Sequence, residues 1–189
     1  MTHALQSPLH LFEYLKFEDA SPTRHEYVGG RVHAMTGGTM RHNRISLNVA
    51  KTLSDRFDGT PCQVFINDMK LHVQAADSVY YPDVLVYCGS PIAGGEKLVQ
   101  DALMVVEVAS ESTAGIDRRE KRVAYQRLPG LRAYWIVSQT EQRVEVYSRD
   151  AGGPWQATAY GPGDSIPTQW LTDEVTVLSA IYAGTDIAA

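Results

Sequence analysis

The chain has 189 residues, of which 44% are hydrophobic and 21% are charged, and its formal net charge is −5. This composition is ordinary for a globular protein, and the length allows a single domain, residues 1–189, with a substantial core. The negative charge excludes general electrostatic attraction to nucleic acid. Any binding to DNA therefore requires a local basic face, or cations that offset the carboxylates.

Neither export nor membrane insertion is indicated. The N-terminus lacks a basic segment followed by an apolar stretch, and no run approaches the roughly 18 apolar residues of a membrane span. The two cysteines, Cys62 and Cys88, have no metal-ligand spacing, and two are too few for a disulfide framework. We therefore expect both to be small apolar core residues. We also expect a cytoplasmic protein without membrane association.

The first half of the chain contains two helical patterns and a hairpin. Apolar residues at helical spacing predict a short helix over 9–17. Residues 24–35 predict a β-hairpin, in which Gly29-Gly30 supplies the positive φ angles of a tight turn. A longer helix is predicted over 42–57, with one apolar face formed by Ile45, Val49, Ala50, Leu53 and Phe57.

Strands dominate the remainder. Short strands are predicted at 64–66 and 71–73, and continuous apolar runs at 79–87 and 103–108 are typical of central strands. A charged helix is predicted over 117–128, followed by a hairpin of 134–137 with 144–147 and weaker strands at 156–160 and 174–178. The pattern predicts an α/β (α+β) fold with a mixed central β-sheet flanked by helices and additional β-hairpins.

Two of the apolar runs each carry one carboxylate. Asp83 follows Pro82 at the start of VLVY, and Glu107 interrupts the run MVVEV. A buried charge is costly unless it is paired or binds a metal. Asp83 and Glu107 are 24 residues apart, enough for a loop between neighbouring strands, and Lys121 follows 14 residues later. Oxygen ligands and a nearby cation are what metal-assisted hydrolysis of a phosphodiester requires.

Each of these residues also has a structural explanation. Asp83 could be an exposed acid at a strand start, and Glu107 could form a buried ion pair with an arginine such as Arg122. Lys121 lies in the charge run DRREKR, and such runs usually form the solvated face of a helix.

Basic side chains gather on the two longer predicted helices. Two explanations fit these side chains: they contact the phosphates of a nucleic acid, or they form ordinary solvated surface. The residues are Arg118, Arg119 and Arg122 on one helix, and Arg41, Arg44 and Lys51 on or beside the other. His33 and His42 match no zinc pattern, and we assign them as a strand residue and a helix-start residue.

Several short motifs, taken in order, resemble the Uma2 family of endonucleases within the PD-(D/E)XK nuclease superfamily. The resemblance spans about residues 9–178 and rests on Glu26-Tyr27 before the glycine turn, Pro82-Asp83-Val84, Val106-Glu107-Val108, the run 117–121, Tyr125 and the run 133–137. It implies a restriction-endonuclease-like core and cleavage of DNA that depends on Mg²⁺ or Mn²⁺. Nucleases of this fold are often dimers, so a homodimer is also expected.

The resemblance also implies roles for individual residues. Asp83, Glu107 and Glu26 would hold the metal. The superfamily's lysine usually lies two residues after the second acid, where this chain has Ala109, so the resemblance makes Lys121 on the following helix the candidate.

Two other functions stay open at this point. One is a catalytically inactive domain of the same fold that binds nucleic acid or a protein partner. The other is an α/β metalloenzyme acting on a small phosphate ester, for which a closed pocket rather than a wide cleft would be expected.

Overall fold

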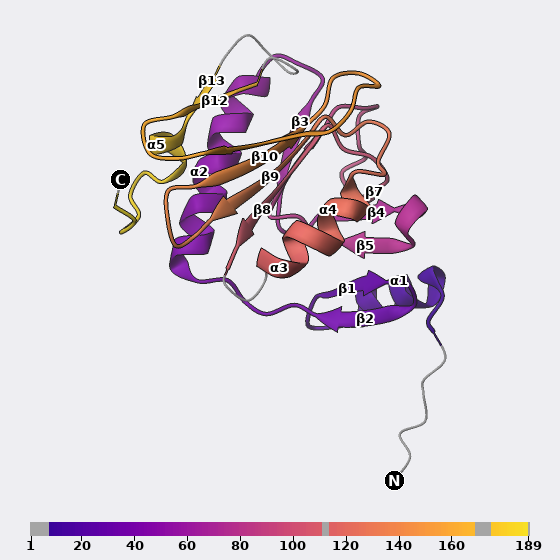
Figure 1. The fold of residues 1–189 in the computed structure, drawn as a ribbon. Coiled ribbons are helices and arrows are strands. Elements are labelled where there is room, and N and C mark those ends of the chain that lie inside the picture. Colours follow the sequence, from indigo (N-terminus) through magenta and orange to yellow (C-terminus); the bar gives the residue numbers. More distant parts are fainter. Residues whose placement is uncertain (1–7, 111–113, 169–174, 189) are drawn as a thin grey trace.

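The computed structural model describes residues 8–110, 114–168 and 175–188. A six-stranded mixed sheet has the order β11-β10-β9-β8-β6-β3, and a five-stranded mixed sheet has the order β2-β1-β5-β4-β7. In the larger sheet the two central strands, β8 (Met104–Ala109) and β9 (Ala133–Ser138), are parallel. All other neighbouring strands of this sheet pair antiparallel: β6 (Val84–Tyr87) with β8, β3 (Gln63–Ile66) with β6, β10 (Val144–Ser148) with β9, and β11 (Gln156–Tyr160) with β10. Helices lie on both faces of this sheet (Figure 1). The expected fold class is confirmed.

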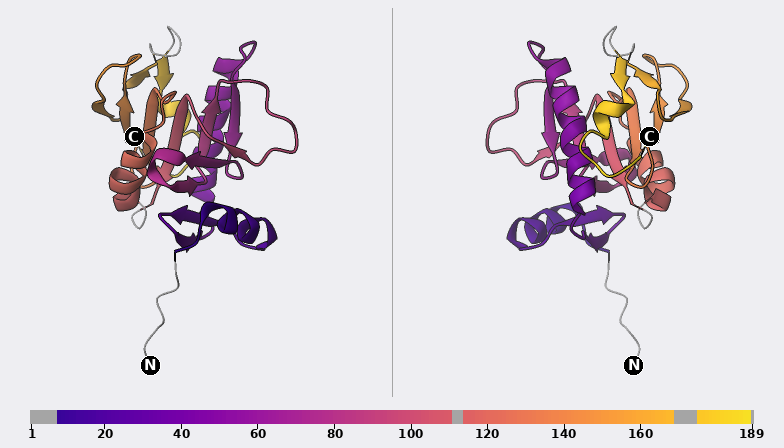
Figure 2. Two further views of the ribbon diagram at one scale, coloured as in Figure 1. Left: turned by 90° about the vertical axis from the view of Figure 1, so that its right-hand side faces the viewer. Right: turned by 90° about the vertical axis from the view of Figure 1, so that its left-hand side faces the viewer.

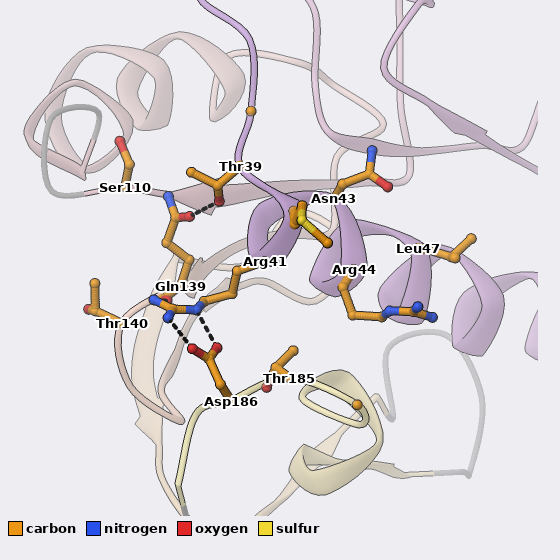
Figure 3. Close-up of a pocket in the computed structure, with 13 residues that line it drawn as sticks. Thr39, Arg41, Asn43, Arg44, Leu47, Ser110, Gln139, Thr140, Thr185 and Asp186 are labelled. Carbon is orange, nitrogen blue, oxygen red and sulfur yellow. Dashed lines mark hydrogen bonds and ion pairs between the residues drawn. The ribbon is translucent and has the colours of Figure 1, made fainter.

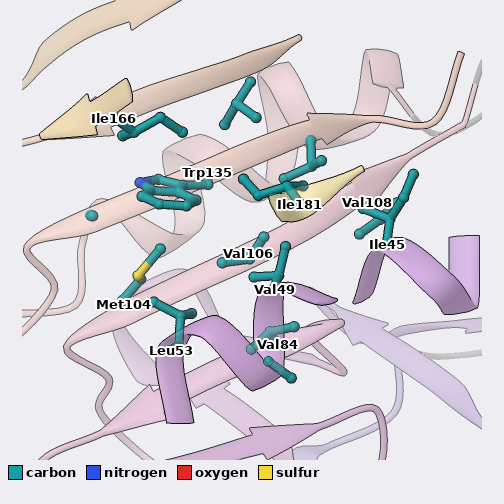
Figure 4. Packing of buried hydrophobic residues seen from close by; sticks show 14 of the residues in the cluster. Ile45, Val49, Leu53, Val84, Met104, Val106, Val108, Trp135, Ile166 and Ile181 are labelled. Carbon is teal, nitrogen blue, oxygen red and sulfur yellow. The ribbon is translucent and has the colours of Figure 1, made fainter. Parts of the chain in front are cut away.

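The long helix α2 (Met40–Phe57) covers one face of the larger sheet. Its five expected core residues are all buried, and they pack against alternate residues of β8 and β9, including Val106 and Trp135 (Figure 4). The short helix α5 (Leu178–Ile181) packs on the same core beside a small ladder of β12 (Ser165–Pro167) with β13 (Val175–Val177). Sequence patterns did not indicate β12 or α5, and Glu174, in the expected strand 174–178, lies outside the described residues.

The opposite face is covered by a helical segment and by the smaller sheet. Three helical pieces follow one another: α3 (Ala114–Ile116), a π-helical turn η2 (Asp117–Lys121) and α4 (Arg122–Tyr125). With β4 (Lys70–Val73) and β5 (Ser78–Tyr80) they enclose a second core that contains Val105, Tyr134 and Ile136. Glu107 points to this face, because side chains alternate along a strand.

The N-terminal elements lie at one end of the molecule (Figure 2). They are α1 (Leu11–Ala20) and the hairpin of β1 (His25–Val28) with β2 (Arg31–Ala34). Gly29 and Gly30 have φ angles of 53° and 86°, as the expected turn requires. Strand β1 joins β5, which attaches the hairpin to the rest of the smaller sheet. The short strand β7 (Leu98–Val99) lies at the other edge.

The expected continuous strand 79–87 is wrong. The chain forms β5 and β6 in different sheets, separated by residues 81–83. Proline has no backbone N–H and cannot donate to a ladder, so Pro82 suits this crossing between sheets. The break places Asp83 immediately before β6, at the junction of the two sheets.

The expectation for the cysteines is also wrong. Cys62 and Cys88 form a disulfide rather than serving as separate core residues, and Cys88 is exposed. The antiparallel register of β3 with β6 pairs Gln63 with Tyr87, so the two cysteines are the next residues to face each other. Within the described residues, no helix has the length and apolar character needed to cross a membrane.

Candidate active site

The two carboxylates expected to act together lie side by side. Strands β6 and β8 pair antiparallel with Val84 opposite Val106, so Asp83 is the next residue along and faces Glu107. Asp83 Oδ2 accepts a hydrogen bond from the backbone N–H of Val108 at 2.7 Å, which extends the ladder through a side chain. Sheet register therefore brings together two acids from separate apolar runs.

Lys121 reaches the same point from the helical segment. Its Nζ lies 2.8 Å from Glu26 Oε1, 3.2 Å from Glu107 Oε1 and 3.9 Å from Asp117 Oδ1. Its side chain is only 10% exposed, so the solvated-face explanation does not apply to this residue. The π-helical turn that carries Lys121 is a rare geometry, frequent at functional sites.

Glu26 comes to this cluster from the N-terminal hairpin. The side chain of Glu26 is 15% exposed, and its Oε1 also accepts a hydrogen bond from the backbone N–H of Tyr81 at 3.3 Å. Two acids from distant segments, Glu26 on β1 and Glu107 on β8, thus converge on Lys121 beside Asp117, which lies four residues before it in η2.

Glu107 is the most deeply placed of these acids. Its side chain is 5% exposed, and Oε1 accepts a second hydrogen bond, from the Tyr125 hydroxyl at 2.8 Å. Arg122 is not its partner, because the Arg122 guanidinium donates to the Arg118 carbonyl and lies over the Tyr147 ring. The buried pair proposed as the structural alternative exists, but with Lys121.

The charges in the cluster do not balance. Burial raises the pKa of the Glu107 carboxyl, and nearby Asp83 and Asp117 raise it further, while the Lys121 ammonium opposes these effects. Burial also disfavours the charged form of Lys121, but Glu107, Glu26 and Asp117 outweigh it, so the pKa of Lys121 is raised. Three carboxylates therefore share one ammonium, and Asp83 adds a further negative charge near Glu107. The excess negative charge in a buried place favours binding of a further cation.

His42 was assigned to a helix start, and the structure gives it a contact with the candidate site. It lies in the first turn of α2, where its Nε2 is 3.0 Å from Asp83 Oδ1. The Asp83 carboxylate raises the pKa of His42, against the effect of burial. Both Asp83 oxygens thus have a hydrogen-bond partner. Only tertiary structure could reveal this contact, because 41 residues separate His42 from Asp83.

Hard oxygen donors are present for a divalent cation. Mg²⁺ is usually held by one or two carboxylates together with waters and substrate phosphates, and facing Asp83 and Glu107 fit that description. Among the residues that the structure describes, no cluster of three or more His, Cys, Asp or Glu side chains is arranged to hold a metal. The donor set thus fits a two-carboxylate site, and a third direct ligand from Glu26 is not assembled.

The expected DNA-contacting arginines differ in their surroundings. Arg118 forms an ion pair with Glu145 at 2.8 Å, and Arg119 donates to the Gly115 carbonyl. Arg44 is exposed on α2 and has no carboxylate partner among the described residues. Within the described residues, Arg118 is thus the member of this group that an acid pairs with, whereas Arg44, Arg119 and Arg122 have no carboxylate partner.

An open groove of about 1320 Å³ lies beside the carboxylates rather than around them. It is bounded by the first turns of α2, the residue after β8, the turn after β9 and the C-terminal segment Gly184–Asp186 (Figure 3). Residues of α2 from Met40 to Leu47 line one side of the groove, and because the groove is open, it is unlike the closed pocket expected for a small ester.

Comparison with known proteins agrees with this fold. Two uncharacterized proteins of Synechocystis sp. are 30% and 29% identical to the chain, over 91% and 77% of its length and 90% and 84% of theirs. A crystal structure described as a putative nuclease belonging to DUF820, from Anabaena variabilis, has a TM-score of 0.77 and 15% identity, and the match covers 93% of this chain and 98% of that one. This likeness shows the fold.

A family model, described as "Putative restriction endonuclease", matches residues 11–178, most of the chain. The match includes every residue of the candidate site, from Glu26 to Tyr125. The chain belongs to the Uma2 family.

Proposed function

We propose that the protein is a divalent-metal-dependent endonuclease that hydrolyses DNA phosphodiester bonds through an activated water. One observation carries this proposal: the carboxylates of Glu26, Glu107 and Asp117 surround a single buried lysine where two β-sheets meet, and Asp83 lies next to Glu107 on the neighbouring strand. Membership of a family described as restriction endonucleases supports the reaction class.

In this proposal Asp83 and Glu107 hold Mg²⁺ or Mn²⁺, because the register of β6 with β8 places the two residues next to each other on adjacent strands. The ion, when bound, polarises a phosphoryl oxygen and makes a coordinated water acidic. Glu26 acts at the ion through water, and its Oε1, 2.8 Å from Nζ, also holds Lys121 in place.

Lys121 has two roles in the proposed reaction. Its raised pKa keeps it an ammonium, so it donates hydrogen bonds and does not act as a base. From its position 3.2 Å from Glu107 it would orient the attacking water and offset charge that develops on the phosphate. We include a homodimer in the proposal, since cutting both strands needs two centres, and a cytoplasmic location, where DNA is available.

The test is cleavage of supercoiled plasmid with Mg²⁺ or Mn²⁺. We expect nicked and linear products from the wild type, and none from Glu107→Gln or Lys121→Met. Glu145→Gln is the matched control, because Glu145 pairs with Arg118 on the surface; it should cleave as the wild type does.

Two results would replace this proposal. Hydrolysis of bis-p-nitrophenyl phosphate without cleavage of any DNA would favour an esterase for small phosphate diesters. If folded protein cleaves neither substrate with any divalent metal, the inactive nuclease-fold domain that binds nucleic acid or a protein becomes the better description.

A further inference from the structure

The open groove along α2 is rich in hydrogen-bond donors. Thr39, Asn43 and Thr140 line it together with Arg41 and Arg44 (Figure 3). Among the residues that line it, Asp186 is the acid. The groove is therefore a local basic area on a chain whose net charge is −5. A protein with this net charge needs such a basic area, or cations that offset its carboxylates, to bind DNA.

The groove begins where the candidate active site ends. Arg41 and Asn43 line it, and between them lies His42, whose ring contacts Asp83 at 3.0 Å. Ser110, three residues after Glu107 in the chain, lies at the same end of the groove. A polymer whose scissile phosphate lay at the carboxylates could thus continue along α2.

The two arginines of the groove differ in their partners. Arg41 is held by Asp186 through two hydrogen bonds of 2.7 and 2.6 Å, and it also donates to the Gln139 carbonyl at 3.2 Å. The Asp186 side chain is 71% exposed, and exposed ion pairs contribute little to stability. A phosphate could therefore replace this carboxylate at little cost. Arg44 has no carboxylate partner among the described residues, so a phosphate could bind it without displacing one.

We propose that this groove binds the phosphates of the DNA strand next to the scissile bond, with Arg44 as a permanent contact and Arg41 as a contact that Asp186 occupies in the free protein. The proposal rests on the proposed nuclease function for the nature of its ligand. It adds a substrate-binding surface and a competing carboxylate. Asp186 would act as a mimic of the phosphate that it gives way to.

The test measures binding of a fluorescein-labelled duplex by anisotropy, without divalent metal, in the Glu107→Gln protein. Cleavage plays no part in this readout. We expect Arg44→Ala to weaken binding about threefold or more and to reduce the slope of log Kd against log salt by about 0.9, the value for one lost phosphate contact. Asp186→Asn should tighten binding severalfold.

Lys51→Ala is the matched control, since it removes one positive charge from the same helix outside the groove. The inference is overturned if Arg44→Ala and Lys51→Ala have equal effects, or if Asp186→Asn leaves affinity unchanged. If binding depends on the groove residues but the wild type never cleaves DNA, the proposed nuclease function is wrong and the binding surface is supported. If the wild type cleaves DNA but neither Arg44→Ala nor Asp186→Asn changes binding, the nuclease function is supported and the binding surface is wrong.

Discussion

Lys121 should be essential for stability, not only for catalysis. Replacing it with methionine keeps much of the side-chain volume and removes the ammonium that Glu26, Glu107 and Asp117 share at 2.8, 3.2 and 3.9 Å. Removing one partner of a buried ion pair costs about 3–5 kcal/mol, because the remaining charge is left uncompensated. For a chain of this size, that loss lowers the melting temperature by roughly 6–20 °C.

The assay is thermal unfolding in the absence of divalent metal, followed by circular dichroism. Arg118→Met is the matched control, because Arg118 belongs to the same helical segment but its pair with Glu145 is exposed, with 43% of the arginine side chain accessible. Its loss should cost at most about 1 kcal/mol. A double variant, Lys121→Met with Glu107→Gln, should regain part of the lost stability, since it removes one of the uncompensated carboxylates. If Lys121→Met melts with the wild type, the shared-ammonium description is wrong.

Three further predictions concern single side chains of the site. Burial raises the pKa of Glu107 in the folded protein, so wild-type stability falls as the pH rises from the ordinary glutamate pKa through the raised one. Glu107→Gln, which cannot ionise, should therefore gain stability relative to the wild type over that pH range in metal-free urea titrations. A difference in unfolding free energy between the two proteins that does not change with pH would contradict the raised pKa. His42→Ala should lower Mn²⁺ affinity about 10- to 100-fold by removing the group that orients Asp83, as measured by calorimetry, whereas His33→Ala on β2 should not. Tyr125→Phe should destabilise the protein by about 1–3 kcal/mol, because it removes a buried hydrogen bond to Glu107 and leaves that acceptor with fewer donors; unchanged urea midpoints would count against this bond.

Local patterns were sufficient to predict that Glu107 is a buried acid. Glu107 is conspicuous in the sequence because it interrupts an apolar strand, and the fold buries it as that pattern indicates. The choice of Lys121 as the candidate lysine needed the family resemblance, since a lysine within a charge run is ordinarily solvated, and its contact with Glu107 was not predicted. The amphipathic pattern of 42–57 gave the core face of α2 correctly, because burial there depends only on helical spacing.

What the sequence did not indicate depends on contacts between distant segments. Apolar content alone could not separate one strand over 79–87 from two strands in different sheets, and only the position of Pro82 gave a local signal for the break. The Cys62–Cys88 disulfide follows from the register of β3 with β6, and the His42–Asp83 contact follows from how α2 meets the sheet. Neither register nor helix placement is encoded in the residues nearby.

The most direct test of the central claim is the number of Mn²⁺ ions bound, measured from the electron paramagnetic resonance signal of the free ion with and without a short duplex. The account predicts bound Mn²⁺ in the wild type and in Glu145→Gln, and its loss in Asp83→Asn and Glu107→Gln. Binding that survives both of the latter substitutions, or no binding by the wild type even with DNA present, would contradict a metal site at these facing carboxylates.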